Sequence, residues 1–490
     1  MVPGHTDTDV RNVVLVVIDA LRRDRVGVYA DEGWSLTPNV DRLAADGTLF
    51  ENAFTCTNTT DPSITSIHTG RDPESVVRHH GPFVTDAEKR RAEAVETVPE
   101  RLHGAGFMTA VTGRTLGRWH GRGFEHYPEP SLGRYRRRAI GERLGAISPR
   151  LRALAGEVYE RVSAAVDSGT ADEIEQFLGA LGDRPFYGMV HTMDTHVPYS
   201  YDEGVVDELL SRNDYPDRDL EAFFDAHSDN PYVDETMREY AEPADYEVGL
   251  ARWYAKYDAA AARADRKLGK LIDGLAERGR LDETAVIVTS DHGESLDEHG
   301  IYFDHHGLYE PQIRVPLVVR GPGIPDRRRD EMVQLYDLAP TTLDLLGVRN
   351  GLDADGRSLV PLLGGAGEWD DREQVVFQEA NAQRRLGVRT GRYKYITAAP
   401  DEVLERERGN AFRCGYCDTV HGDERELFDI EADPGETENL VGERPALADR
   451  LDGAIEAYYE ELETVEAGDG RVEYEDEEEV MERLEDLGYR

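Results

Sequence analysis

Short apolar runs alternate with amphipathic segments over residues 12 to about 365. Residues 12–18 and 285–290 are two of these runs, and continuous apolar runs of this length are typical of buried parallel strands. Residues 37–47 begin with a capping threonine and a proline and end at glycine, while residues 255–278 carry apolar side chains along one stripe. The alternation predicts an α/β fold with a mainly parallel sheet covered by helices. Further strands are predicted at residues 109–112, 185–190 and 315–320.

Each of these two apolar runs is followed directly by residues of types that commonly bind metal ions. Asp19 directly follows the first run, and Asp291 and His292 follow the second. Parallel strands end at a common edge of the sheet, where open α/β folds bind their ligands. Aspartate is also common in ordinary loops after strands, but the two strand ends together indicate one shared metal site.

A polar segment at residues 55–70 lies between these strands and leads into a helix expected to begin near Pro62 and to end at Gly70. Thr60 is expected just before the helix N-terminus, where backbone N–H groups favour an anion. A hydroxyl group there, beside a divalent cation, can become an alkoxide nucleophile. The alternative is that Thr60 and Ser63 only cap the helix.

The pattern changes near residue 371. We predict a catalytic α/β domain at residues 1–370 and a C-terminal α+β subdomain at residues 371–490 with an acidic helical tail. Within the first domain, residues 201–250 are acidic, rich in tyrosine and weakly periodic, which indicates an insertion or lid. A small antiparallel sheet is predicted from strands at residues 374–378, 386–396 and 426–430, with a tight turn at residues 390–392.

The charge balance narrows the possible partners. The 490 residues include 56 basic and 99 acidic side chains, a formal net charge of −43. The spread of acidic residues along the whole chain resembles the composition of proteins from extreme halophiles, whose acidic surfaces stay hydrated in molar salt. Such a charge argues against nucleic acid binding through a basic face. The chain shows no membrane span and no signal-like start, so a cytoplasmic location, in a cytoplasm of high salt, is expected.

Three cysteines, Cys56, Cys414 and Cys417, do not make a disulfide framework. Cys414 and Cys417 have the spacing of a small zinc clip, with Asp418 and His421 nearby. That set offers at most three good ligands, and a pair of free thiols is the favoured interpretation.

The chain resembles the sulfatase family of the alkaline phosphatase superfamily. The resemblance covers nearly the whole length and implies an α/β/α sandwich with a small C-terminal sheet. Its motifs, in order, are residues 12–19, 37–43, 60–63 with 69–70, 191–199, 288–294, 308–317, 355–359 and 426–440.

The resemblance implies one divalent metal ion, held by Asp19, Asp291, His292 and the Thr60 oxygen. These ligands suit calcium, magnesium or manganese, and the imidazole favours manganese slightly. Many sulfatases carry a second aspartate directly after the first, whereas this chain has Ala20, which makes the site less like a calcium site.

Other site residues also follow from the resemblance. His196 matches a residue that contacts the transferred group or the leaving oxygen, and His305 or its neighbour His306 would protonate the leaving alkoxide. Arg114 lies near the place of a substrate-contacting lysine, although Arg118 lies in a segment, residues 118–120, that resembles the same family motif.

The nucleophile position departs from the family pattern. Classical sulfatases oxidise a cysteine or serine there to formylglycine, whereas Thr60 cannot yield that aldehyde, so no formylglycine is expected. A threonine sulfate must be released by attack of water at sulfur, while a threonine phosphate is an ordinary intermediate. The resemblance implies a hydrolase of small-molecule or glycan sulfate esters, whereas the threonine nucleophile favours phosphate or phosphonate esters. The alternatives are a phosphodiesterase, a phosphonate monoester hydrolase or a phosphoglycerol-type transferase that uses the same Thr60, and a non-catalytic protein that binds anionic glycans.

Overall fold

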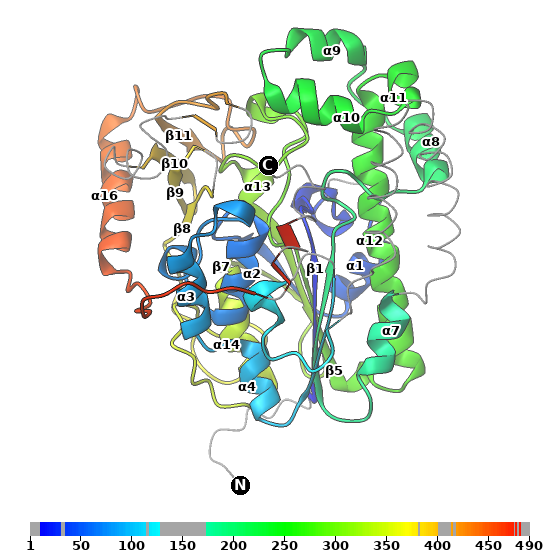
Figure 1. The fold of residues 1–490 in the computed structure, drawn as a ribbon, viewed down its shortest axis with the longest axis vertical. Helices are drawn as coiled ribbons and strands as arrows, with labels where there is room; N and C mark the ends of the chain where they lie inside the picture. The colour runs from blue at the N-terminus through cyan, green and yellow to red at the C-terminus, as the bar shows by residue number, and fades with distance from the viewer. Residues whose placement is uncertain are drawn as a thin grey trace.

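The computed structural model describes residues 10–30, 35–113, 117–127, 173–380, 383–399, 413–414, 418–474, 476–477 and 480–481. Two sheets organise this part of the chain (Figure 1).

The larger sheet has seven strands in the order β3-β4-β1-β5-β6-β2-β7. All neighbours are parallel except at β6, which runs antiparallel to both β5 and β2. The strands are β1 (Asn12–Ile18), β2 (Thr48–Phe54), β3 (Met108–Thr112), β4 (Phe186–Thr192), β5 (Thr284–Thr289), β6 (Arg314–Arg320) and β7 (Arg327–Gln334). The predicted mainly parallel sheet is confirmed.

Helices cover both faces of this sheet, and this explains the unbroken apolar run of β1. Val13, Leu15 and Val17 point into one core, while Val14 and Val16 point into the other. The first core is shared with α2 (Thr60–Thr69), α4 (Val98–Gly104) and α14 (Leu338–Leu345). The second is shared with α1 (Pro38–Ala45), α7 (Glu173–Ala180) and α12 (Ala251–Glu277), on the opposite side of the sheet in Figure 1. The expected α/β/α sandwich is confirmed.

Two strands of the large sheet, β2 and β7, escaped the sequence patterns. In β2, Glu51 and Asn52 interrupt the apolar residues, and the register with both neighbours shifts beside them. β7 is an edge strand that begins with the exposed Arg327 and Arg328. Neither strand therefore shows the continuous burial on which the prediction depended.

The smaller sheet is antiparallel, with four strands in the order β11-β10-β9-β8, as predicted. These are β8 (Gln374–Gln378), β9 (Arg385–Thr390), β10 (Tyr393–Ala398) and β11 (Arg425–Asp429), and α16 (Pro445–Glu461) packs against them. The backbone N–H of Gln378 donates to the carbonyl of Cys56 (3.0 Å), and that of Ala380 donates to the side-chain oxygen of Asn58 (2.9 Å). The small sheet thus holds the loop that leads into α2.

The acidic segment at residues 201–250 is helical, with α8 (Glu203–Arg212), α9 (Leu220–Ala226), α10 (Arg238–Tyr240) and α11 (Pro243–Val248). Apolar side chains of this segment, such as Leu220, Phe223 and Phe224, form a local core with Trp253 of α12 and with Phe303. The segment therefore packs beside the loop that follows β5, at the top of Figure 1.

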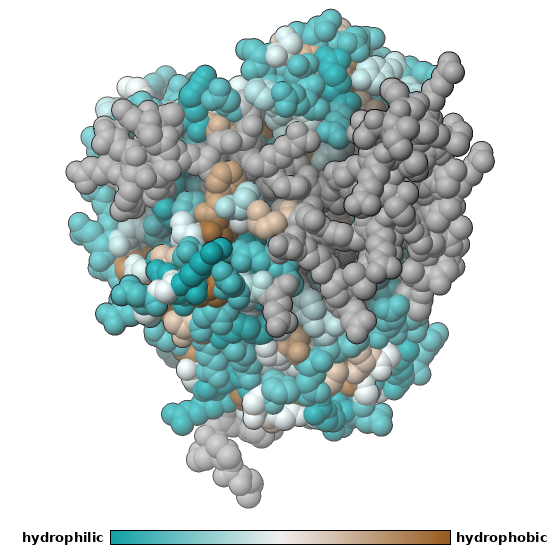
Figure 2. Space-filling view, viewed as in Figure 1, coloured by the Kyte–Doolittle hydropathy of each residue, from teal (hydrophilic) through white to brown (hydrophobic). Residues whose placement is uncertain are grey.

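The face of the molecule drawn in Figure 2 is mostly hydrophilic where the structure describes it. Among the described residues, no helix combines the length and the hydropathy that crossing a membrane requires.

Candidate active site

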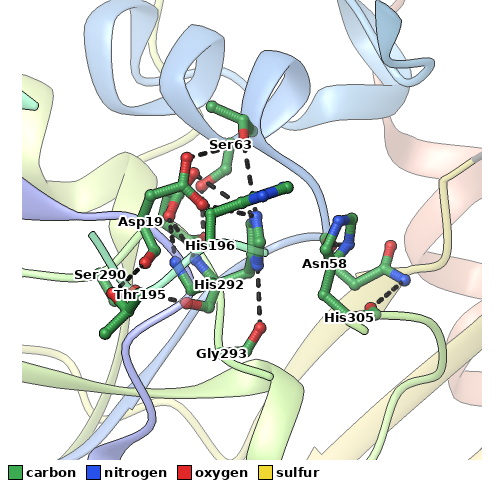
Figure 3. Close-up of polar contacts among 12 residues, drawn as sticks. Asp19, Asn58, Ser63, Thr195, His196, Ser290, His292, Gly293 and His305 are labelled. Carbon is green, nitrogen blue, oxygen red and sulfur yellow. Dashed lines mark hydrogen bonds and ion pairs between the residues drawn. The ribbon is translucent and has the colours of Figure 1, made fainter. Parts of the chain in front are cut away.

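The ends of β1 and β5 bring three candidate metal ligands together, of which Figure 3 labels Asp19 and His292. The two strands are parallel neighbours, with Val17 opposite Thr289, so the residues that follow them meet at one edge. One ligand atom each from Asp19, Asp291 and His292 lies within 4.8 Å of the others, and all three side chains are buried. The structure thus brings together the three side chains that the sequence placed at two distant strand ends.

The hydrogen bonds of these side chains leave atoms that fit a cation. Asp291 Oδ1 accepts from the N–H of Ala20 (3.3 Å) and of His292 (3.0 Å). Among the described residues, Asp19 Oδ1 and Asp291 Oδ2 accept no hydrogen bond although both are buried. Because buried carboxylate oxygens that accept no hydrogen bond are costly, a cation between these two fits the arrangement.

His292 is oriented for ligation. Its Nδ1 lies 2.9 Å from the carbonyl oxygen of Gly293, which only accepts, so Nδ1 carries the hydrogen. Nε2 then presents its lone pair 3.6 Å from both Asp19 Oδ1 and Asp291 Oδ2. A carbonyl that fixes the tautomer of a ligating histidine is the usual outer partner of such a ligand.

Polar contacts hold the turn after β1. The Thr195 hydroxyl donates to the carbonyl of Asp19 (2.5 Å), and the Ser290 hydroxyl donates to that of Ile18 (2.6 Å). The Tyr257 hydroxyl donates to the carbonyl of Ala20 (2.7 Å), a residue with a φ of 58°. Three segments thus fix the backbone that presents the Asp19 carboxylate.

Thr60 is the first residue of α2, whereas the sequence placed it just outside a helix beginning near Pro62. Its Oγ1 lies 3.3 Å from Asp19 Oδ2 and 3.4 Å from His292 Nε2. Thr59 occupies the N-cap position without a capping side-chain bond, and the Ser63 hydroxyl donates to the carbonyl of Asp291 (2.8 Å). The two hydroxyls therefore face the strand ends and do not cap the helix.

Sequence analysis missed His191 as part of this cluster. It is the last residue but one of β4 and lies directly opposite Val17. Its Nε2 lies 3.4 Å from Asp19 Oδ2 and 4.0 Å from Asp291 Oδ2. Burial lowers the pKa of His191, but the hydrogen bond to Asp19 and the two carboxylates outweigh it and the net pKa is raised. Part of the signal was available, because His191 directly follows the apolar run at residues 185–190, as Asp19 follows that at residues 12–18.

Imidazoles and carboxylates influence one another throughout the cluster. Burial raises the pKa of Asp19, yet the hydrogen bond with His191 and the nearby His196 and His292 lower it overall. The site is therefore suited to charged groups despite its burial.

His196 and His305 lie beside His292. The centroid of the His305 ring is 4.5 Å from that of His292 and 5.5 Å from that of His196. His305 Nδ1 donates to the carbonyl of Asn58 (2.8 Å), and His196 Nδ1 donates to that of Val197 (2.6 Å). Burial and the imidazoles around it hold the pKa of His305 well below its ordinary value. Figure 3 shows the Asn58–His305 contact next to the metal-ligand cluster.

The neighbouring His306 faces a different group of side chains. Its ring centroid is 6.0 Å from that of His305, and its Nδ1 lies 3.5 Å from Cys414 Sγ. Of the two alternatives for the acid, His305 is the one whose ring packs on His292.

Arg114 lies outside the described residues. Arg118, the other arginine considered, is buried and donates to Asp61 Oδ2 (2.5 Å), which also accepts from the N–H of Gly81 (2.8 Å). His120 Nε2 lies 3.0 Å from Asp61 Oδ1. Burial raises the pKa of Asp61, but the Arg118 guanidinium together with His80 and His120 outweighs it and holds the pKa well below its usual range. Arg118 thus anchors the residue next to Thr60.

Comparison with known proteins identifies the family. The sulfatase family model matches residues 11–348, and a model described as N-sulphoglucosamine sulphohydrolase, C-terminal, matches residues 297–404. A choline-sulfatase of Rhizobium meliloti is 25% identical over 473 residues, covering 88% of this chain and 82% of its own. An arylsulfatase of Clostridium perfringens is 25% identical over 505 residues, covering 93% and 95%.

Solved structures share the fold. A phosphonate monoester hydrolase from Silicibacter pomeroyi has a TM-score of 0.65 at 20% identity, covering 92% of this chain and 96% of its own. A protein solved with its substrate D-glucosamine-2-N,6-O-disulfate has a TM-score of 0.62 at 21% identity, covering 92% and 97%.

The sandwich fold and the family match define a hydrolase of the sulfatase class. The chain belongs to the sulfatase family.

Proposed function

We propose that this chain is a metal-dependent hydrolase that cleaves sulfate esters through Thr60. The observation that carries the proposal is the position of Thr60 Oγ1, 3.3 Å from Asp19 Oδ2 and 3.4 Å from His292 Nε2. The hydroxyl lies where a cation held by Asp19, Asp291 and His292 would also reach it. Calcium, manganese and magnesium remain the candidate ions, since the ligands combine hard carboxylates with an imidazole.

In the first step of the proposed reaction, Thr60 attacks the ester while His196 and Arg114 bind its oxygens. A bound divalent cation would favour the ionised form of the Thr60 hydroxyl. Thr60 Oγ1 attacks the sulfur, forming a new O–S bond as the bond from sulfur to the alcohol oxygen breaks. His196, with Nε2 protonated as well as Nδ1, donates through Nε2 to an equatorial oxygen, and Arg114 is proposed to donate to another.

Release of the alcohol and recovery of Thr60 complete the cycle. The departing oxygen takes a proton from the charged form of His305, which an anionic ester bound among these imidazoles would favour. Water then attacks the sulfur of the threonine ester and the Thr60 hydroxyl is regenerated. The substrate is a small-molecule or glycan ester.

Phosphate and phosphonate esters form a second candidate substrate class. A threonine nucleophile favours them, because water displaces phosphate from threonine by an ordinary substitution. The phosphonate monoester hydrolase with the same fold gives this alternative a structural precedent. A phosphodiester or phosphoglycerol-type donor would use the same Thr60.

The test compares an aryl sulfate, a phosphonate monoester and a phosphodiester in molar KCl, with calcium, manganese or magnesium added after chelation. Thr60→Ala should lose roughly 10³-fold or more in kcat, while Thr60→Ser should retain activity. Thr69→Ala is the matched control, because Thr69 lies at the other end of α2 and donates to the Thr65 carbonyl (2.7 Å).

Each result decides one part of the proposal. Sulfate turnover that needs Thr60 and added metal supports it. Turnover of phosphorus esters alone selects the second candidate. Full activity of Thr60→Ala on every substrate overturns the nucleophile.

A further inference from the structure

A second cluster of metal-binding side chains lies next to the active site, on the other side of His305. His306, Cys414 and His421 each offer one ligand atom, all within 4.8 Å of one another, and all three residues are buried. They come from two segments far apart in sequence, the loop before α13 (Glu310–Ile313) and the segment before β11. We propose that they form a zinc site.

The chemistry of the three groups selects the ion. One thiol and two imidazoles are the ligands that zinc prefers, whereas calcium and magnesium take oxygen ligands. The cluster of Asp19, Asp291 and His292 instead offers mostly carboxylate oxygens, which suit calcium or magnesium. The two clusters therefore differ in the ion that each suits.

The surroundings of His306 match those of a zinc-bound histidine. Its Nδ1 faces Cys414 Sγ at 3.5 Å, while its Nε2 lies 3.4 Å from Asp304 Oδ2. A ligating histidine usually directs its second nitrogen at a carboxylate or carbonyl, which fixes the ring and strengthens the ligand. Asp304 is itself held by backbone bonds with Ser295 in both directions (2.8 and 3.1 Å).

The other two residues are also held in place. The N–H of Cys414 donates to the carbonyl of Thr419 (2.8 Å), and that of Asp418 donates to the carbonyl of Cys414 (3.2 Å). The His421 carbonyl accepts from the buried Arg385 (3.2 Å), and its N–H donates to the Gln383 side chain. The Cys414 thiol and the His421 ring thus sit on a backbone whose position is fixed from both sides.

The structure changes the ligand set that sequence spacing suggested. Asp418 is 77% exposed and pairs with Arg413 (3.4 Å), outside the cluster, while His306 from a distant segment takes part. Cys417 lies outside the described residues, and the proposal depends only on the other three. Zinc there would fasten the loop that carries His305 to the C-terminal part of the chain.

The test is titration of the chelator-stripped, full-length protein with Co²⁺, which reports thiolate ligation by an intense charge-transfer absorption in the near ultraviolet. We expect one equivalent of Co²⁺ to produce this band and Zn²⁺ to remove it, with one thiol proton released on binding. Absence of the band in the folded wild-type protein overturns the proposal, and this result needs no variant.

Variants locate the metal. Cys414→Ser should lose the band, His421→Gln should bind Co²⁺ at least about tenfold more weakly, and Asp304→Asn should bind about 10- to 100-fold more weakly. Cys56→Ser, which changes a buried thiol elsewhere, and Asp291→Asn, which changes the other cluster, should both keep the band. A band that survives in Cys414→Ser, or that Asp291→Asn abolishes, overturns the assignment. Because the Co²⁺ band is measured without substrate, it tests the zinc site independently of the proposed role of Thr60.

Discussion

Asp61 links the nucleophile position to a buried arginine. Its carboxylate receives Arg118 at 2.5 Å and the N–H of Gly81 at 2.8 Å, and both charged side chains are buried. A buried ion pair contributes little net stability, yet removing one partner leaves the other charge without compensation. Asp61 also stands next to Thr60 in the first turn of α2.

We expect Asp61→Ala to lower the free energy of unfolding by roughly 3–5 kcal/mol, because Arg118 would remain charged and buried. Urea denaturation at neutral pH in molar KCl measures this change. Asp86→Ala is the control, since Asp86 also lies in the first turn of a helix, α3 (Asp86–Ala94), but is exposed. Equal stabilities of the two variants would contradict the role given to Asp61.

Asp72 offers a pH-dependent test away from the metal ligands. Burial raises its pKa to about 7 from an ordinary 3.8, although the N–H of Glu74 and the Tyr458 hydroxyl donate to it. Because the folded protein holds the proton more tightly, the stability that this proton contributes is present below pH 4 and is lost as the pH rises to 7.

Relative to Asp72→Asn, the wild-type free energy of unfolding should therefore fall between pH 4 and pH 7, by on the order of a few kcal/mol. Thermal or urea unfolding across this range measures the difference. Asp353→Asn should keep the wild-type profile, because the Asp353 side chain is 93% exposed. If the free energies of unfolding of wild type and Asp72→Asn differed by the same amount from pH 4 to pH 7, the raised pKa of Asp72 would be ruled out.

The strand-end loop after β5 packs directly on α13. Gly293 lies between His292 and Glu294, and a Cβ atom added to it would come 1.9 Å from the carbonyl oxygen of Pro311. This neighbour is backbone, so the loop or the helix would have to move. The N–H of Gly293 also donates to the Gln312 carbonyl (2.7 Å), which fixes the same contact.

Gly293→Ala should displace His292 and reduce ester hydrolysis by about 10²-fold or more, as misplacement of a positioned group by 1 Å does. Gly204→Ala provides the control in α8, where an added Cβ meets nothing within 4 Å. That variant should keep activity and gain about 0.5–1 kcal/mol in unfolding free energy. Steady-state kinetics and urea denaturation of both variants test the pair, and wild-type activity in Gly293→Ala would refute the contact.

In the large sheet, sequence patterns captured the strands that are buried on both faces and missed β2 and β7, which are not. β1 and β5 stand out because each is a continuous apolar run, and their register then brings Asp19 and Asp291 together. His191 also follows a predicted apolar strand, but its place beside Asp19 depends on the order of β4 next to β1, which periodicity does not encode. The approach of His306 to Cys414 is likewise a contact between distant segments.

The net charge of −43 belongs to the molecule as a whole. At low ionic strength the acidic side chains repel one another across the compact state. Salt screens the repulsion between charges farther apart than the Debye length, which is about 10 Å at 0.1 M and about 3 Å at 1 M.

We expect the unfolding midpoint to rise by on the order of 10 °C between dilute buffer and molar KCl, as the repulsion is screened. Thermal unfolding followed by circular dichroism measures the shift, and sorbitol at matched osmolality separates charge screening from exclusion of the solute. A midpoint that does not respond to KCl, or responds equally to sorbitol, would speak against the adaptation to salt that the composition indicates.

The sheet order also dictates when the active site can exist. β1 pairs with β5 although Ala20 and Asp291, which bond across this edge, stand 271 residues apart in the chain. The carboxylates of the predicted metal site therefore stay separated until the ribosome has released β5, and a shorter nascent chain has no place to hold the ion. Loss of the β1–β5 pairing would dismantle the site in one step, so metal release would report opening of the centre of the sheet.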